Sequence, residues 1–360
     1  MMSRKTIFIT AGGTGGHVFP ALSLYNHLSL KKLNPKIITD ERGNKYLKGY
    51  PNLNLEIIKS SSIFGKNLFS LMISLITVLS SFIYCLKILL KNKPALVLGM
   101  GGYTSFPMCL AAKFLFVPLI IYENNIILGK TNKVLQFFSK KILFSYKEIK
   151  GVNTLNKNKI IVVGNIIRKE ILDYKNSKIV DLNNEINILV LGGSQAAKIF
   201  GDKLPGIFLN CKKNNINLKI FQQCTKNQKD VIEKFYKENS IDSDLFTFNN
   251  NILDYFKKTD IVITRSGASI CAELINCRIP FISVPLPSSA DNHQFLNSKY
   301  LEEKGFNIML TEDKIESELF ELIKILSKDK SIINRIIEKQ KKYSDREVFK
   351  KIDKVLEAFL

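Results

Sequence analysis

The amino-acid sequence predicts an α/β protein of two domains, each with a parallel sheet covered by helices on both faces. First, short apolar runs of strand length alternate with stretches of helical pattern along the whole chain. Second, 360 residues suffice for two hydrophobic cores. Third, a glycine-rich loop follows a strand-like run twice, near residue 12 and again near residue 192.

The predicted strands form two series. The first comprises residues 6–10, 36–39, 95–98, 118–122, 142–145 and 160–163, and the second comprises residues 186–191, 218–222, 261–264 and 281–284. Polar stretches at 156–159 and 173–185 surround the start of the second series, which is typical of a domain boundary. We therefore expect an N-terminal domain at 1–165, a C-terminal domain at 166–335, and a lysine-rich C-terminal helix at 336–360 that packs back on the N-terminal domain.

The first glycine loop lies in TAGGTGGHVFPAL, residues 10–22, and the second lies in INILVLGGSQAA, residues 186–197. Glycine allows a tight turn and close approach of a ligand, and the helix that follows directs N–H groups and a positive end toward an anion. Neither loop fits GxGxxG or GxxxxGK[ST], which argues against nicotinamide and ATP. The expected ligand is a phosphate or a sugar phosphate.

The formal net charge of +21 allows two interpretations. It can reflect biased coding, since lysine, asparagine and isoleucine are used heavily, or it can serve anionic partners such as phosphorylated substrates or an acidic membrane. No nucleic acid is expected, because no nucleic-acid-binding motif accompanies the charge. The six cysteines form no CxxC pair and are expected to be buried in a reducing compartment, without a metal. The first strand begins so early that a signal peptide is not expected.

Residues 68–86, LFSLMISLITVLSSFIYCL, contain no formal charge. Three interpretations are open: a helix lying in the membrane interface, a buried packing helix, or a transmembrane span. The small polar residues Ser70, Ser74, Thr77 and Ser81 recur on one side of such a helix, which favours packing of that side on a protein body. A span would separate the loops at 12–16 and 99–102, so we favour interfacial contact. The flanking lysines Lys66, Lys87, Lys91 and Lys93 would then lie near anionic head groups.

Six segments together carry a family resemblance: TAGGTGGHVFPAL, LGMGGYTSFP (98–107), YENN…TNK (122–133), VVGNIIR (162–168), LGGSQAA (191–197), and TRSGASICAEL…PFISVPLPSSADNHQFLN (264–297). In this order and spacing they closely resemble the MurG family of glycosyltransferase family 28. The resemblance implies a GT-B fold, with two Rossmann-like domains facing across a cleft.

The resemblance implies transfer of GlcNAc from UDP-GlcNAc to the C4 hydroxyl of MurNAc in lipid I, giving lipid II and UDP. The anomeric configuration inverts, and neither a cofactor nor a metal is implied. The family acts in cell-wall synthesis at the cytoplasmic face of the bacterial inner membrane, as a peripheral protein, and residues 68–86 match its membrane-contact patch. Two alternatives stay open: a related transferase acting on diacylglycerol, and an inactive UDP-sugar-binding membrane protein.

The acceptor hydroxyl must lose its proton during attack, so a general base is expected within reach. His17 is the first candidate, as base or base relay, and Glu123 is its rival. A structural histidine that holds the loop is the other interpretation of His17. The acceptor's pyrophosphate is expected at backbone N–H groups of the two N-terminal glycine loops, with an aromatic side chain beside it. These residues are Gly12, Gly13, Gly101, Gly102 and Tyr103.

The donor residues are carried over from the family by motif. Arg168 and Ser194 would bind the diphosphate, Glu273 the ribose hydroxyls, Gln294 the sugar, and Asn249 the uracil through its backbone. The remaining candidates are Thr14, Gly15, Gly16, Asn125, Ser266, Gly267 and Ala268. Several positions depart from the common family pattern, and these departures put efficiency in doubt more than the reaction class. They include Tyr122, Ala196, Ala197 and Ile270.

Overall fold

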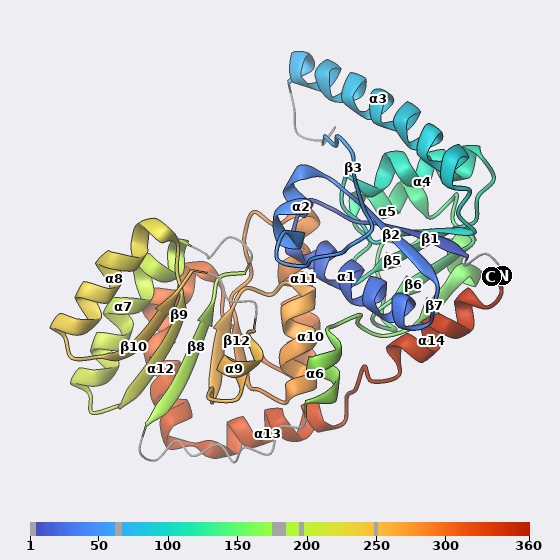
Figure 1. Ribbon diagram of the computed structural model, residues 1–360. Coiled ribbons are helices and arrows are strands. Elements are labelled where there is room, and N and C mark those ends of the chain that lie inside the picture. Colours follow the sequence, from blue (N-terminus) through green and yellow to red (C-terminus); the bar gives the residue numbers. More distant parts are fainter. Residues whose placement is uncertain (1–4, 62–66, 175–184, 194–197, 248–250) are drawn as a thin grey trace. The chain divides into compact units, whose positions relative to one another are not determined.

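The computed structural model describes residues 5–61, 67–174, 185–193, 198–247 and 251–360 (Figure 1). The chain divides into two compact units. Unit 1 comprises Met1–Lys169 together with Asp345–Leu360, and unit 2 comprises Glu170–Ser344. Each unit contains one sheet whose paired strands are all parallel, so the prediction of two parallel-sheet domains is confirmed.

The sheet of unit 1 has seven strands in the order β3-β2-β1-β4-β5-β6-β7. The chain builds outward from β1 to β3 and then returns to place β4 on the other side of β1. Ligands of open α/β sheets bind at such a switch point, beyond the carboxyl ends of the strands. The strands are β1 (Thr6–Thr10), β2 (Asn34–Thr39), β3 (Leu55–Ile57), β4 (Leu96–Gly99), β5 (Leu119–Glu123), β6 (Lys141–Phe144) and β7 (Ile160–Val162).

The helices of unit 1 bury apolar faces on this sheet, and the last of them comes from the end of the chain. Figure 1 shows α14 beside α1. The His27 ring stacks on Phe349 with centroids 4.5 Å apart, and its Nε2 lies 2.7 Å from Asp353 Oδ1. The helices are α1 (Gly15–Leu30), α2 (Glu41–Leu47), α3 (Leu68–Asn92), α4 (Ser105–Phe114), α5 (Lys130–Leu135) and α14 (Val348–Leu356), with a 3-10 turn at Thr154–Lys159.

The sheet of unit 2 has six strands in the order β10-β9-β8-β11-β12-β13. They are β8 (Ile186–Leu191), β9 (Leu218–Gln223), β10 (Asp242–Phe246), β11 (Ile261–Thr264), β12 (Phe281–Ser283) and β13 (Ile308–Met309). The helices are α6 (Lys169–Asp173), α7 (Lys198–Lys213), α8 (Lys226–Glu238), α9 (Leu253–Phe256), α10 (Ala268–Cys277), α11 (His293–Glu303), α12 (Ile315–Lys328) and α13 (Lys330–Lys341), with 3-10 turns at Ala290–Asn292 and Glu312–Lys314.

Helix α3 contains the uncharged segment and extends to Asn92. Ser74 and Ser81 are buried, as the small polar stripe predicts, and Ser74 Oγ accepts a hydrogen bond of 3.0 Å from Ser61 Oγ. Large apolar side chains on the other faces of α3 are 47–75% exposed. They are Phe69, Met72, Ile73, Leu75, Ile76, Leu79 and Ile83.

The stretch Met72–Asn92 is long and apolar enough to cross a membrane by length and composition, and it is the one such helix among the residues described. The chain, however, enters α3 from β3 and leaves it into β4, and both strands belong to the sheet of unit 1. A transmembrane helix would place these two strands on opposite sides of the bilayer. The topology therefore excludes the span interpretation.

Candidate active site

His17 lies where the first two glycine loops of unit 1 meet. Its ring packs against Gly101 and Gly102, which follow β4 and have φ of +90° and +79°. A Cβ placed on Gly101 would lie 2.9 Å from His17 Cε1, closer than real side chains approach. Glycine is therefore required here by backbone conformation and by the ring. Tyr103 follows in the same loop and is partly exposed.

Glu123 ends β5 and is only 3% exposed. Its Oε1 accepts hydrogen bonds from the backbone N (3.1 Å) and Nδ2 (2.8 Å) of Asn125. Its Oε2 accepts from Gly129 N (2.9 Å) and from Asn132 Nδ2 (3.1 Å). Four donors occupy the capacity of a carboxylate. The geometry is that of a buried anchor for the loop after β5.

This anchor extends to the residue before His17. Asn125 Nδ2 donates to Asn124 Oδ1 at 3.2 Å, and Asn124 Nδ2 donates to the backbone O of Gly16 at 3.0 Å. Neither Asn124 nor Asn132 is among the predicted site residues. Both lie in the YENN…TNK segment, but the pattern alone does not reveal which amide faces which loop.

A second buried carboxylate, Asp40, holds the first glycine loop from the end of β2. Its Oδ1 accepts from Gly13 N (3.0 Å) and Gly43 N (2.9 Å), and its Oδ2 accepts from Ser60 Oγ (2.8 Å) and Arg42 Nε (3.0 Å). Burial alone would raise the pKa of Asp40, but these hydrogen bonds and the Arg42 charge hold it below its ordinary value. Sequence reasoning missed Asp40, although its place after a strand and before a helix is typical of an N-cap.

The first loop offers fewer free N–H groups than the sequence predicts. Gly13 N donates to Asp40, and Thr14 N donates to the backbone O of Gly12 at 3.1 Å. Gly12 itself is enclosed, since a Cβ there would lie 2.2 Å from Thr104 Oγ1. An anion at this loop thus depends on the first turn of α1, which begins at Gly15, and on nearby side chains. Thr14, the N-cap residue, is exposed and makes no side-chain capping bond.

Tyr122, a departure from the family pattern, is buried and bonded to the segment that leads to Arg168. Its hydroxyl accepts from Ile166 N at 2.9 Å and donates to Gly164 O at 3.3 Å. Burial raises the pKa of this phenol. Asp345, where the chain re-enters unit 1, accepts from Asn165 N at 2.9 Å. Arg168 follows this bonded segment and is partly buried.

In unit 2, the predicted donor residues gather at the carboxyl end of β11. Ser266 is fully buried and its Oγ donates to Gln294 O at 2.9 Å, so its side chain fixes the loop. Gly267 is the N-cap residue of α10, and Ala268 is its first residue. Gln294 Oε1 accepts from Leu286 N at 3.0 Å. Its Nε2 has no protein partner among the residues described.

Glu273 lies on α10 and is 8% exposed, which excludes a solvated surface glutamate. Arg265 is not among the predicted site residues, and it is buried between two loops. Its Nη2 lies 2.5 Å from Glu312 Oε2, and its Nη1 donates to the backbone O of Val284 and of Pro285, both at 3.3 Å. Arg265 therefore fixes the loop after β12 beside the start of α10.

Five positions named in the sequence analysis lie outside the described residues: Lys66, Ser194, Ala196, Ala197 and Asn249. Of the remaining predicted site residues, Arg168 and those of the loops after β1, β4 and β5 belong to unit 1. Those around α10 and α11 belong to unit 2. Within the described part of the chain, no group of three or more His, Cys, Asp or Glu side chains is arranged to hold a metal.

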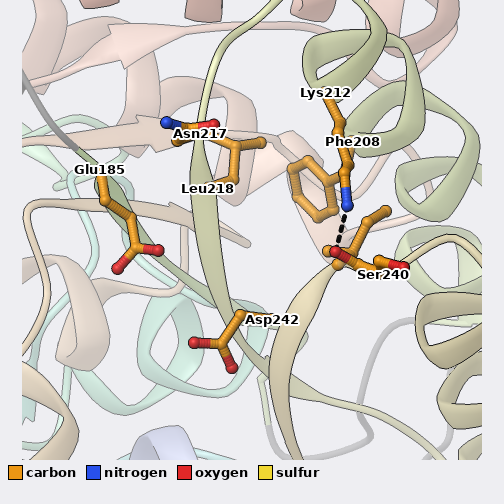
Figure 2. Close-up of a pocket in the computed structure, with 8 residues that line it drawn as sticks. Glu185, Phe208, Lys212, Asn217, Leu218, Ser240 and Asp242 are labelled. Atoms are coloured by element: carbon orange, nitrogen blue, oxygen red, sulfur yellow. Dashed lines mark hydrogen bonds between the residues drawn. The ribbon is translucent and has the colours of Figure 1, made fainter.

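A cavity of about 170 Å³ in unit 2 lies away from these residues (Figure 2). Its lining includes Glu185, Leu218 and Asp242, at the amino ends of β8, β9 and β10. Lys212 reaches across to donate to the backbone O of Ser240. The cavity thus lies at the amino ends of these strands, whereas the loops described above follow the carboxyl ends.

Comparison with known proteins identifies the family. The model of the glycosyltransferase family 28 N-terminal domain matches residues 7–144, and that of the C-terminal domain matches residues 187–355. A relative from Rickettsia bellii, named UDP-N-acetylglucosamine–N-acetylmuramyl-(pentapeptide) pyrophosphoryl-undecaprenol N-acetylglucosamine transferase, is 38% identical, covering 89% of this chain and 91% of its own. One of the same name from Pelagibacter ubique is 34% identical, with coverage of 92% and 88%.

A solved structure agrees on the fold. The crystal structure of Acinetobacter baumannii MurG has a TM-score of 0.77 at 22% identity, and the match covers 98% of this chain and 99% of that one. The family models, the relatives and the two-sheet fold lead to one assignment. The chain belongs to glycosyltransferase family 28, with the pyrophosphoryl-undecaprenol N-acetylglucosamine transferases of that family.

Proposed function

We propose that this enzyme transfers GlcNAc from UDP-GlcNAc to the C4 hydroxyl of MurNAc in lipid I, with inversion, and releases lipid II and UDP. The names of relatives that match nearly the whole chain support this reaction. The observation that carries the proposal is the packing of His17 on Gly101 and Gly102, which joins two family motifs into one site. Acceptor binding is assigned to unit 1 and donor binding to unit 2. The predicted boundaries of 165/166 and 335/336 shift accordingly, because only Asp345–Leu360 of the stretch 336–360 joins unit 1.

We assign the role of general base to His17. A base must be able to accept a proton from the attacking hydroxyl, and an imidazole does so near neutral pH. Glu123 is a poorer candidate, because its two oxygens already accept four hydrogen bonds and it is nearly inaccessible. Its role in the proposal is to hold Asn125 and, through Asn124, the backbone beside His17.

The donor side of the proposal uses groups of unit 2 together with Arg168, which belongs to unit 1. Glu273 accepts from the ribose hydroxyls, and Gln294 presents its Nε2 to the sugar. The main chain at Gly267 and Ala268 begins α10, whose N-terminal end favours an anion. Arg168 and Ser194 complete the set at the diphosphate. Charge that develops on the departing UDP is stabilised by such donors when they are in place before the reaction.

Membrane association is part of the proposal. The exposed apolar surface of α3 would enter the interface, while its buried serines keep it attached to unit 1. Exposed Lys87, Lys91 and Lys93 follow it and would lie near anionic head groups. This arrangement suits a peripheral protein on the cytoplasmic face of the inner membrane, where a lipid-linked acceptor is embedded.

The test is transfer of labelled GlcNAc by the purified protein, with a lipid I analogue and diacylglycerol offered in parallel and a chelator present. Transfer to the lipid I analogue alone is the expected result. Transfer to diacylglycerol would change the acceptor and leave the donor standing. Binding of UDP-GlcNAc without transfer to either would contradict the proposal and favour an inactive sugar-nucleotide-binding protein.

A further inference from the structure

Arg42 stands beside the first glycine loop in a fixed position. Its Nε and Nη2 each lie 3.0 Å from Asp40 Oδ2, so one carboxylate oxygen holds two corners of the guanidinium. Its side chain nevertheless remains 54% exposed. Within the part of the chain that the structure describes, Nη1 has no acceptor. A charged donor is thus immobilised with one side open to solvent.

Arg42 also borders the open face of Gly13. A Cβ placed on Gly13 would have a single neighbour within 4 Å, the Arg42 Nη2 at 3.8 Å. The positive φ of +83° at Gly13 excludes most side chains from that face. The space above this glycine is therefore clear, and its boundary is a guanidinium.

The electrostatics of the loop favour such a cation. Asp40 takes the N–H of Gly13 and places a negative charge directly behind the loop. An anionic ligand at this loop would meet that charge and would lack one backbone donor. Arg42 compensates for both, because it offsets the Asp40 charge and presents N–H groups of its own. A guanidinium suits this task because its planar donors match phosphate oxygens in pairs, which an ammonium does not.

We infer that Arg42 binds the diphosphate of the lipid-linked acceptor, and that Asp40 positions it. This inference rests on the proposed function, since it names a ligand for the acceptor of that reaction. Asp40 acts through other groups: it fixes the guanidinium, the Gly13 N–H and, through Ser60 and Thr104, the second glycine loop. The pair gives unit 1 a diphosphate site made of side chains, in addition to the start of α1.

The experiment compares Arg42→Ala, Arg42→Lys and Lys45→Ala by steady-state kinetics with a lipid I analogue. Lys45 is a matched control, because it is an exposed cation on the same short helix. We expect Arg42→Ala to raise the acceptor KM about 10- to 100-fold, with the UDP-GlcNAc KM changed less than twofold. Arg42→Lys should recover only part of the loss, and Lys45→Ala should change neither KM. An unchanged acceptor KM, or an equal rise in both KM values, would overturn the inference.

A second measurement tests the diphosphate site without depending on the transfer reaction. With UDP saturating the donor site, titration with inorganic pyrophosphate should bind the wild-type protein and bind Arg42→Ala at least 10-fold more weakly. This difference should appear even if the acceptor is not lipid I. Equal binding by both proteins would contradict a diphosphate site at Arg42. Asp40→Asn should weaken pyrophosphate binding less than Arg42→Ala does, and the double variant should be no weaker than Arg42→Ala alone.

Discussion

The two units use different side chains to fix the loops that follow their strands. In unit 1, the buried carboxylates Asp40 and Glu123 each accept four hydrogen bonds, and between them they fix the loops after β1, β2 and β5. In unit 2, the corresponding loops are fixed by a serine hydroxyl, by amide groups and by the Arg265–Glu312 pair. The two buried carboxylates of unit 1 support the loops of the proposed acceptor site, so substitutions there should affect turnover and acceptor binding. Changes in unit 2 should affect the donor.

The largest effect is expected for His17→Ala. Loss of a general base lowers turnover by about 10²–10⁴-fold, since the attacking hydroxyl then loses its proton only to solvent. Binding of UDP-GlcNAc to unit 2 should stay within about twofold of wild type. Turnover is measured by labelled transfer and binding by calorimetry. An equal loss of turnover and of UDP-GlcNAc binding would show that His17 only holds the loop.

Glu123→Gln should have the next largest effect. The amide keeps the shape but cannot accept from four donors, and an unsatisfied buried donor costs about 1–3 kcal/mol. We expect a fall in kcat/KM of about 10- to 100-fold as Asn125 and the Gly16 carbonyl lose their support. The pH–rate profile should keep its acidic limb, because the proposed base, His17, is still in place. Disappearance of that limb would make Glu123 the base and reverse our assignment.

Glu273→Ala tests the other half of the comparison. If Glu273 accepts from the ribose, its loss removes hydrogen bonds to a charged group worth about 1.5–3 kcal/mol, or about 10- to 100-fold in donor KM. The acceptor KM should change little. A defect confined to kcat would argue against ribose binding. Glu302→Ala, on α11 of the same unit, serves as a control outside the proposed site.

Asp40→Asn should have the smallest effect on turnover and a clear effect on stability. The pKa of Asp40 is lowered in the folded state, so its ionised form stabilises the fold above its unfolded value of about 3.8. That contribution is lost as the pH falls through the lower, folded value. Urea unfolding should therefore find the variant about 1–3 kcal/mol less stable than wild type at pH 7. The gap should narrow below pH 4, and a gap independent of pH would contradict an ionised anchor.

The sequence predicts the interior of both sheets well and their edges poorly. All ten predicted strands are present, because buried parallel strands read as continuous apolar runs. The three missed strands, β3, β10 and β13, are all edge strands, and they are short or polar, as in DSDLF of β10. An edge strand packs on fewer neighbours, so its sequence carries less of the apolar pattern.

The candidate site likewise contains residues that the sequence predicts and residues that it does not. Glycine and histidine motifs locate the loops, because backbone conformation restricts which residues can stand there. The residues that hold the loops, such as Asp40, Asn124 and Arg265, were not predicted. Their importance depends on hydrogen bonds to backbone far away in the sequence, for example from Asn124 to Gly16. No local pattern encodes such a contact.

The division of the chain has a consequence for its synthesis. Unit 1 needs residues from both sides of unit 2, which is inserted into it between Lys169 and Asp345. At ~5–20 residues per second, the ribosome takes roughly 10–35 s to make the inserted part. During that interval the nascent first unit lacks both α14 and the Asp345 carboxylate, so the apolar surface that α14 covers is still exposed to solvent. The face of α1 that carries His27 therefore meets Phe349 and Asp353 of α14 only at the end of translation.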